Sequence, residues 1–115
     1  MNHLEFGKKG EDLAVKFLLE KKYKILDRNF RHKRGEIDII AEKGNFVVFF
    51  EVKTRSNTKF GNPEEAVDLK KEKLIKETAE YFLSKKTKIH FIRFDIIAIT
   101  KTNHNFDLLH LKDVF

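Results

Sequence analysis

The chain has 115 residues, with 24 basic and 18 acidic side chains, a formal net charge of +6 and no cysteine. This length suits one domain over residues 1–115, and the lack of cysteine excludes disulfides, thiol catalysis, iron–sulfur clusters and cysteine zinc sites. The longest apolar run, residues 46–50, is too short to cross a bilayer, and the first residues lack a secretory-signal pattern. We therefore expect a cytoplasmic protein with no membrane partner, whose charge favours nucleic acid as a ligand.

Seven secondary-structure elements are predicted, in the order helix, three strands, helix, two strands. They cover residues 8–22, 24–32, 36–41, 46–54, 62–84, 89–100 and 106–111. Ile37 and Ile39 are expected on one face of the second strand. The third strand is apolar at nearly every position, which indicates burial on both faces. This order favours an α/β fold in which a mixed sheet is flanked by helices.

Turn and cap residues support two of these boundaries. Gly44 and Asn45 predict a hairpin between the second and third strands. Asn62 suits the N-cap of the second helix, Pro63 suits its first turn, and Glu65 occupies a capping-box position. The second helix is therefore expected to begin at about residue 62.

Two charged residues, Glu51 and Lys53, interrupt the apolar third strand. Ionised side chains are seldom buried unless they are paired or bound to a metal, and residues two apart on a strand share a face. A two-residue turn at 44–45 would place Asp38 opposite Glu51 and Glu36 opposite Lys53. The sequence therefore predicts two facing carboxylates, with a lysine beside them.

Two carboxylates about 5 Å apart across a strand pair repel each other, and a hard divalent cation such as Mg²⁺ would remove that repulsion. With Lys53 close by, the pair suits phosphodiester hydrolysis. The alternative is an ordinary ion pair between Glu51 and Lys53, with Asp38 as a strand-end acid. A register shifted by one residue would also turn Asp38 to the other face.

Glu11 is a third acid of interest, because helical spacing places it near Ala14 and Leu18 on the apolar face of the first helix. It could reach a site on the sheet, or it could extend from the edge of this face into solvent. Asp95 follows Arg93 in an apolar strand, where a structural ion pair or a role at the sheet edge is favoured. The five histidines have no ligand spacing, and most of them are expected at the surface or its boundary.

Six short motifs, in this order along residues 10–95, resemble the YraN-like family of uncharacterised bacterial proteins. They are GEDLA (10–14), NFR (29–31), GEIDIIA (35–41), FEVKTR (50–55), PEEAV (63–67) and RFD (93–95). That family resembles the PD-(D/E)XK nuclease superfamily, particularly the archaeal Holliday-junction resolvases. Ile37 stands where the eponymous proline would be.

The resemblance implies a restriction-endonuclease-like fold and a metal-dependent deoxyribonuclease that acts on DNA, including branched or structured DNA. Glu11, Asp38, Glu51 and Lys53 match the catalytic positions. Mg²⁺ or Mn²⁺ would be held by Asp38, Glu51 and the backbone carbonyl of Val52. A homodimer is also implied, because resolvase-like relatives work as symmetric pairs.

Residues 21–34 contain seven basic residues and one acidic residue, so this segment carries the whole net charge of +6. The candidate phosphate contacts are Arg28, Arg31, Arg34, Arg55 and Lys71, although each would also suit ordinary solvated surface. Two other functions fit the same sequence. One is a non-catalytic nucleic-acid-binding module with a vestigial or partner-activated site, and the other is a plain interaction protein.

Overall fold

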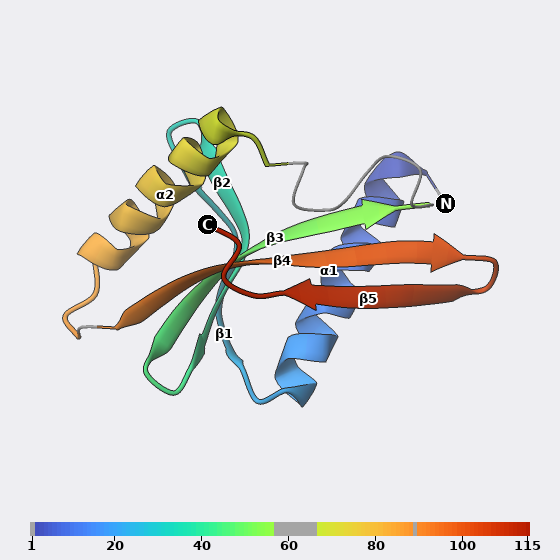
Figure 1. Ribbon diagram of the computed structural model, residues 1–115, viewed down its shortest axis with the longest axis horizontal. Coiled ribbons are helices and arrows are strands. Elements are labelled where there is room, and N and C mark those ends of the chain that lie inside the picture. The colour runs from blue at the N-terminus through green and yellow to red at the C-terminus, as the bar shows by residue number, and fades with distance from the viewer. Residues whose placement is uncertain (1, 57–66, 89) are drawn as a thin grey trace.

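The computed structural model describes residues 2–56, 67–88 and 90–115. Its elements are α1 (His3–Glu20), β1 (Lys24–His32), β2 (Gly35–Lys43), β3 (Phe46–Arg55), α2 (Leu69–Ser84), β4 (Phe91–Thr102) and β5 (Asn105–Leu111). The strands form one five-stranded sheet in sequence order (Figure 1). Only β3 and β4 are parallel, since α2 makes the crossover between them. The predicted α/β class and element order are confirmed.

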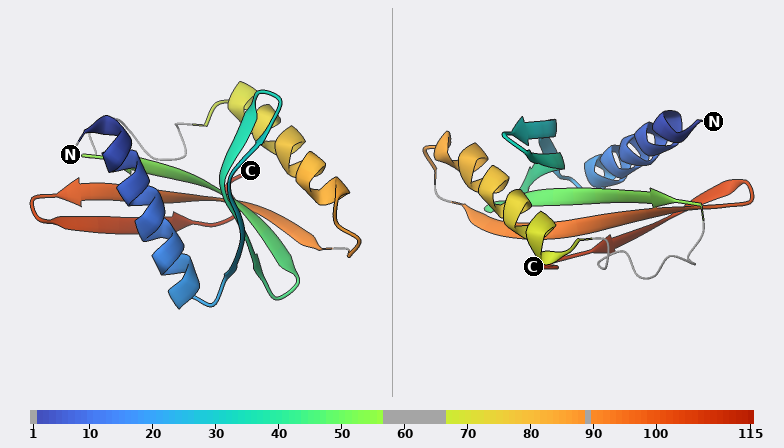
Figure 2. Two further views of the ribbon diagram at one scale, coloured as in Figure 1. Left: turned by 180° about the vertical axis from the view of Figure 1, so that it is seen from behind. Right: turned by 90° about the horizontal axis from the view of Figure 1, so that it is seen from above.

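The two helices cover opposite faces of the sheet, and β3 supplies core residues to both (Figure 2). Val48 and Phe50 pack in the core cluster that contains Ala14 and Leu18 of α1. The alternate residues of β3, including Phe49, pack with Ile75 and Ala79 of α2 in the second cluster. The expected burial of β3 on both faces is confirmed, and burying one such phenylalanine contributes about 1.5–3 kcal/mol.

The prediction that Ile37 and Ile39 share a face is wrong. Ile39 packs under α1, whereas Ile37 packs under α2. The ladder between β2 and β3 runs from the pair Lys43 and Phe46 to the pair Ile39 and Phe50, while the ladder to β1 continues as far as Gly35. The first residues of β2 therefore leave β3 and turn toward α2 with β1 (Figure 1). This divergence opens a fork between β2 and β3.

The second helix begins later than expected. Within the described residues α2 starts at Leu69, and Asp68 is its N-cap, with Oδ1 accepting a hydrogen bond of 2.8 Å from the Lys71 N–H. Aspartate caps a helix as well as asparagine does. The proposed cap and first turn, at Asn62, Pro63 and Glu65, lie outside the described residues.

Two glycines bring the helices close to the fork. A Cβ on Gly10 of α1 would collide with the Thr54 side chain of β3. A Cβ on Gly35, at the start of β2, would collide with Thr78 of α2. Gly10 therefore allows α1 to approach β3 closely, and Gly35 allows β2 to approach α2 closely. A larger residue at either position would force the two elements apart.

Asp95 is buried on β4 in a network of hydrogen bonds. It accepts two from the Arg93 Nε, at 2.9 and 3.1 Å, and one of 3.0 Å from the Asp113 N–H, while His110 Nε2 lies 2.7 Å from Oδ2. Burial opposes ionisation, but these contacts outweigh it and hold the pKa of Asp95 below its ordinary value. The favoured structural ion pair is confirmed. His110 takes part in this network and is only partly buried, with its side chain 10% exposed, so it lies at the boundary that was expected for most of the histidines.

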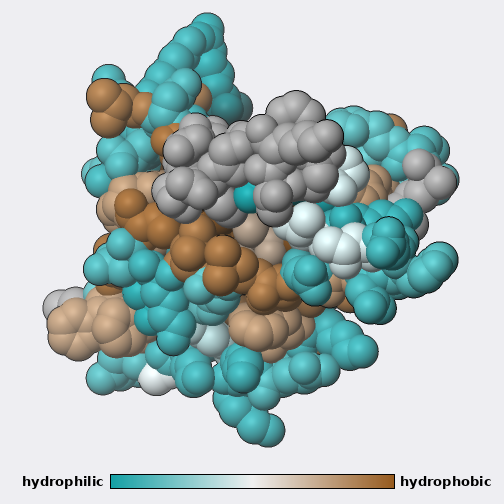
Figure 3. Space-filling model, turned by 45° about the vertical axis from the view of Figure 1, so that its right-hand side comes forward, coloured by the Kyte–Doolittle hydropathy of each residue, from teal (hydrophilic) through white to brown (hydrophobic). Residues whose placement is uncertain are grey.

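Some apolar side chains remain at the surface. Figure 3 shows one face on which hydrophobic surface is collected near the middle and bordered by hydrophilic side chains. Phe91 and Ile92 at the start of β4 are 65% and 47% exposed. The ring centroids of Phe91 and Phe46 are 5.5 Å apart. Within the described part of the chain, no helix is long and apolar enough to span a membrane.

We predict that Gly10→Ala lowers the free energy of unfolding by about 1–3 kcal/mol, because the added methyl group overpacks the contact with Thr54. Gly7→Ala is the matched control, since a Cβ on Gly7, in the same helix, would have no neighbouring atom within 4 Å. That substitution should stabilise the protein by about 0.5–1 kcal/mol through helix propensity. Urea denaturation measures both changes, and equal effects would contradict the close approach of α1 to β3.

Candidate active site

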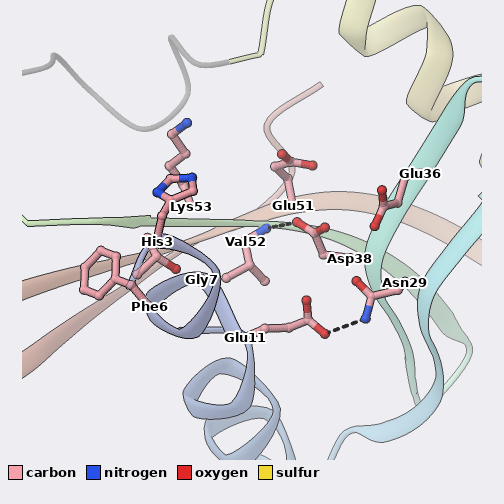
Figure 4. Close-up of a pocket in the computed structure, with 11 residues that line it drawn as sticks. His3, Phe6, Gly7, Glu11, Asn29, Glu36, Asp38, Glu51, Val52 and Lys53 are labelled. Atoms are coloured by element: carbon pink, nitrogen blue, oxygen red, sulfur yellow. Dashed lines mark hydrogen bonds between the residues drawn. The ribbon is translucent and has the colours of Figure 1, made fainter. Parts of the chain in front are cut away.

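One cleft gathers all four residues predicted to form the catalytic site. The cavity has a volume of about 360 Å³, and Glu11 of α1, Asp38 of β2, and Glu51 and Lys53 of β3 contribute to its lining. Figure 4 shows these side chains around the fork between the two strands, with the Val52 backbone between Glu51 and Lys53. Three elements that are separate in the sequence thus bring their polar residues to one place.

The predicted hairpin register is confirmed in the five pairs that β2 and β3 form, and it leads to Asp38 and Glu51 as the next two positions. The ladder stops one pair before them, so the two acids lie where the strands diverge. The Asp38 Oδ2 accepts a hydrogen bond of 2.8 Å from the Val52 N–H. Because the N–H and C=O of a strand residue point to the same side, the Val52 carbonyl also points toward β2.

The proximity of the two carboxylates changes the ionisation of Asp38. Burial and the negative charge of Glu51 raise the pKa of Asp38 to about 7, against the hydrogen bond from Val52. Glu11 and Glu36 raise it further. The site therefore has a deficit of positive charge, which a cation between the acids would relieve.

Glu11 is held toward the cleft by β1. Its Oε1 accepts hydrogen bonds from Arg28, at 3.1 Å from Nε and 3.0 Å from Nη2, and from Asn29 Nδ2 at 3.0 Å. The side chain is only 15% exposed, so the alternative in which Glu11 extends into solvent is wrong. Asn29 has a φ of 53°, a left-handed conformation that asparagine tolerates better than most residues.

Glu51 has a different cationic partner from the one that the sequence suggested. Lys71 Nζ of α2 lies 2.6 Å from Glu51 Oε1. Lys53 is exposed at the edge of the cleft and, among the residues that the structure describes, forms no ion pair. The alternative of a Glu51–Lys53 ion pair is therefore wrong.

The candidate phosphate contacts fall into three groups. Arg28 is bound to Glu11 and Asp12, and Arg31 pairs with Glu36 at 3.4 Å while its side chain remains 75% exposed. Arg34 and Lys71 line a second cavity of about 240 Å³, which shares Glu36, Asp38 and Glu51 with the first. Arg55 and Lys101 line a third cavity, which shares His3, Phe6 and Thr54 with the first. The structure thus places Arg34 and Lys71 next to the acids, and Arg55 farther along β3.

Asn29 and Glu36 are among the residues that line the main cleft but were not predicted as site residues. Asparagine is uncommon inside strands, so its position in β1 was a usable signal. Glu36 was placed opposite Lys53 by the register, and its spacing of two residues from Asp38 on the same strand indicated that the two acids lie close together. This spacing was a usable signal for Glu36 as well.

The oxygen donors suit a hard divalent cation. Two carboxylates and one backbone carbonyl, from Asp38, Glu51 and Val52, are the kind of ligands that Mg²⁺ and Mn²⁺ take, with water completing the shell. Within residues 2–56, 67–88 and 90–115, no group of three or more His, Cys, Asp or Glu side chains is arranged to hold a metal. Two carboxylates and one carbonyl suit Mg²⁺, which usually keeps several water ligands.

Comparison with known proteins gives a consistent family. The model of the uncharacterised protein family UPF0102 matches residues 10–99. A UPF0102 protein of Thermodesulfovibrio yellowstonii is 52% identical over 115 residues, which are 100% of this chain and 99% of the relative. One from Caldicellulosiruptor saccharolyticus is 46% identical over 118 residues, with both chains fully covered. These matches confirm the resemblance to the YraN-like family.

We predict that Asp38→Asn stabilises the metal-free protein at pH 8. Because the folded-state pKa of Asp38 is about 7 and its ordinary value is 3.8, the folded state binds more protons at this site between these values. The free energy of unfolding of the wild type should therefore fall as pH rises through this window, relative to the variant. The advantage of the variant should be greatest above pH 7 and should vanish near pH 4.

Urea denaturation in EDTA from pH 4 to pH 8 measures this difference. Asp107→Asn is the control, because it removes the same charge from an exposed position on β5. A difference between wild type and Asp38→Asn that does not vary with pH would show that Asp38 is not destabilised in the folded state.

Proposed function

Since the chain belongs to the uncharacterised protein family UPF0102, its function must be argued from its site, and we propose a metal-dependent endonuclease that hydrolyses DNA phosphodiesters. The observation that carries this proposal is the fork between β2 and β3. There, Asp38 and Glu51 lie with Glu11 and Lys53 around one open cleft. A surface without a binding or catalytic role would not be expected to concentrate acids at the point where two core strands diverge.

Each residue has a role that follows from its position. Asp38, Glu51 and the Val52 carbonyl would hold Mg²⁺ or Mn²⁺. When bound, such an ion supplies Lewis-acid activation of a phosphoryl oxygen and of a water molecule. Lys53, exposed at the edge of the cleft, would bind a phosphate oxygen or orient the attacking water. Glu11, fixed by Arg28 and Asn29, is placed to accept hydrogen bonds from water.

The charge distribution supports DNA as the substrate. Residues 21–34 carry the net charge of +6, and they include β1, which borders the cleft through Asn29. Phosphate binding by such a flank is independent of base sequence. Branched or structured DNA and a homodimer in which each copy cuts one strand belong to the proposal through the resolvase resemblance. The cytoplasmic location expected from the sequence is part of the same proposal.

A specific observation favours a second function, a nucleic-acid-binding module with a vestigial or partner-activated site. Both Glu11 and Glu51 are already neutralised by cations of this chain, Arg28 at 3.0 Å and Lys71 at 2.6 Å. A protein that binds no metal could use such pairs to keep its acids stable. The two functions differ in cleavage but share salt-sensitive binding.

We expect the wild type with Mg²⁺ or Mn²⁺ to cleave at least one of three substrates: duplex, single-stranded or four-way DNA. Asp38→Ala, Glu51→Gln and Lys53→Met should each lower the rate by about 100-fold or more, because each removes a group that acts on the reacting phosphate. Asp107→Asn should cleave like the wild type. If wild type and Asp38→Ala behave alike on all three substrates, the catalytic proposal fails.

Binding is measured separately with Asp38→Asn, which should bind DNA without cutting it. We expect the affinity to fall steeply with salt, because phosphate binding releases counterions. Arg31→Glu combined with Arg34→Glu should weaken binding and lower the salt dependence. Lys9→Glu combined with Lys16→Glu makes the same charge change on exposed positions of α1 and should have a smaller effect. An affinity that is independent of salt would exclude both nucleic-acid functions.

A further inference from the structure

Lys71 occupies an unusual position for a lysine. It lies on the same face of α2 as the buried residues Ile75 and Thr78, whereas Lys70 and Lys73 are exposed. Its ammonium group reaches the sheet and lies 2.6 Å from Glu51 Oε1. The Glu51 side chain is 13% exposed and the Lys71 side chain is 41% exposed, so the contact is shielded on the side of the acid and open to solvent on the side of the lysine. The neutralising charge for Glu51 therefore comes from a separate element, across the fork.

The position of Lys71 within the helix argues against a role in helix stability. It follows the N-cap Asp68 by three residues, in the first turn of α2. This end of a helix carries a partial positive charge, which disfavours cations. The ion pair with Glu51 offsets that cost. The position of Lys71 thus stabilises the charge of Glu51 and does not stabilise α2.

We propose that Lys71 is a positioning residue that neutralises Glu51 while the site holds no metal and moves to a substrate phosphate once Glu51 binds the divalent cation. This inference rests on the proposed function, since it concerns the same acids. Glu51 Oε1 cannot serve fully both as partner of Lys71 and as metal ligand, because the two cations would repel each other at this distance. Lys71 and the metal therefore compete for Glu51.

The second cavity provides the place to which Lys71 can move. It is lined by Arg34 and Lys71 together with Asp38 and Glu51, and it adjoins the main cleft through these acids. A phosphate in this cavity would face two cationic side chains from different elements. Metal in the main cleft and phosphate in the second cavity would each break the ion pair between Lys71 and Glu51, which opposes the binding of both.

This arrangement makes metal and DNA binding cooperative. Metal binding frees Lys71 for the phosphate, and phosphate binding removes Lys71 from competition for Glu51. By thermodynamic linkage the two affinities must rise by the same factor. A site built in this way binds the metal weakly without DNA, and it binds the metal more tightly once DNA is bound.

The test measures Ca²⁺ binding by isothermal titration calorimetry with the metal-free wild type, Lys71→Met, Lys71→Arg and Lys70→Met. Lys71→Met should bind Ca²⁺ about fivefold to tenfold more tightly than the wild type, because it removes a competing ion pair worth about 1 kcal/mol. Lys71→Arg keeps the competing charge and should bind as the wild type does. Lys70→Met, which loses an exposed charge from the same helical turn, should change the affinity by less than about twofold.

A second measurement uses DNA affinity with and without Ca²⁺. The increase that Ca²⁺ causes should be smaller for Lys71→Met than for wild type and Lys70→Met, which a purely structural lysine would not produce. If Lys71→Met binds Ca²⁺ no more tightly than wild type, this inference is wrong while the nuclease proposal stands. If wild type binds no Ca²⁺ and Lys71→Met does, competition is supported. If no variant binds Ca²⁺, both proposals fall.

Discussion

The mutual repulsion of two carboxylates, Asp38 and Glu51, is the interaction around which the rest of the site is arranged. Both acids lie at the point where β2 leaves β3, and burial makes their charges costly. The surrounding contacts reduce that cost: the Val52 N–H is bonded to Asp38, and Lys71 neutralises Glu51. A site that keeps such repulsion without a catalytic or binding use would be expected to lose one of its acids.

The fold supports this arrangement through rigid elements. β3 lies between two hydrophobic clusters, one under each helix, and cannot shift without disturbing both. The close contact of Gly10 with Thr54 brings α1 to the end of β3, where Glu11 faces the acids. Buried Asp95 ties β4 to β5 through its network and is not among the residues that line the main cleft, so we assign this network to the stability of the sheet.

The main features of fold and site could be predicted because they depend on local patterns. Apolar periodicity located the strands and helices, and the two-residue turn before Phe46 set the register that directs Asp38 toward Glu51. The face of Ile37 could not be predicted, since the divergence of β2 depends on its packing against α2. The partner of Glu51 was also missed, because a nearby lysine in the strand suggested a local pair.

The sequence by itself determined the order of the elements and the hairpin register, because each follows from spacing along one or two neighbouring segments. It also singled out four of the polar residues that line the cleft. Only the tertiary structure decided which cations lie against which acids. Arg28 is 17 residues from Glu11, and Lys71 is 20 residues from Glu51. Such pairs form when helices pack on a sheet, and packing depends on the whole core, so no local pattern in the sequence encodes them.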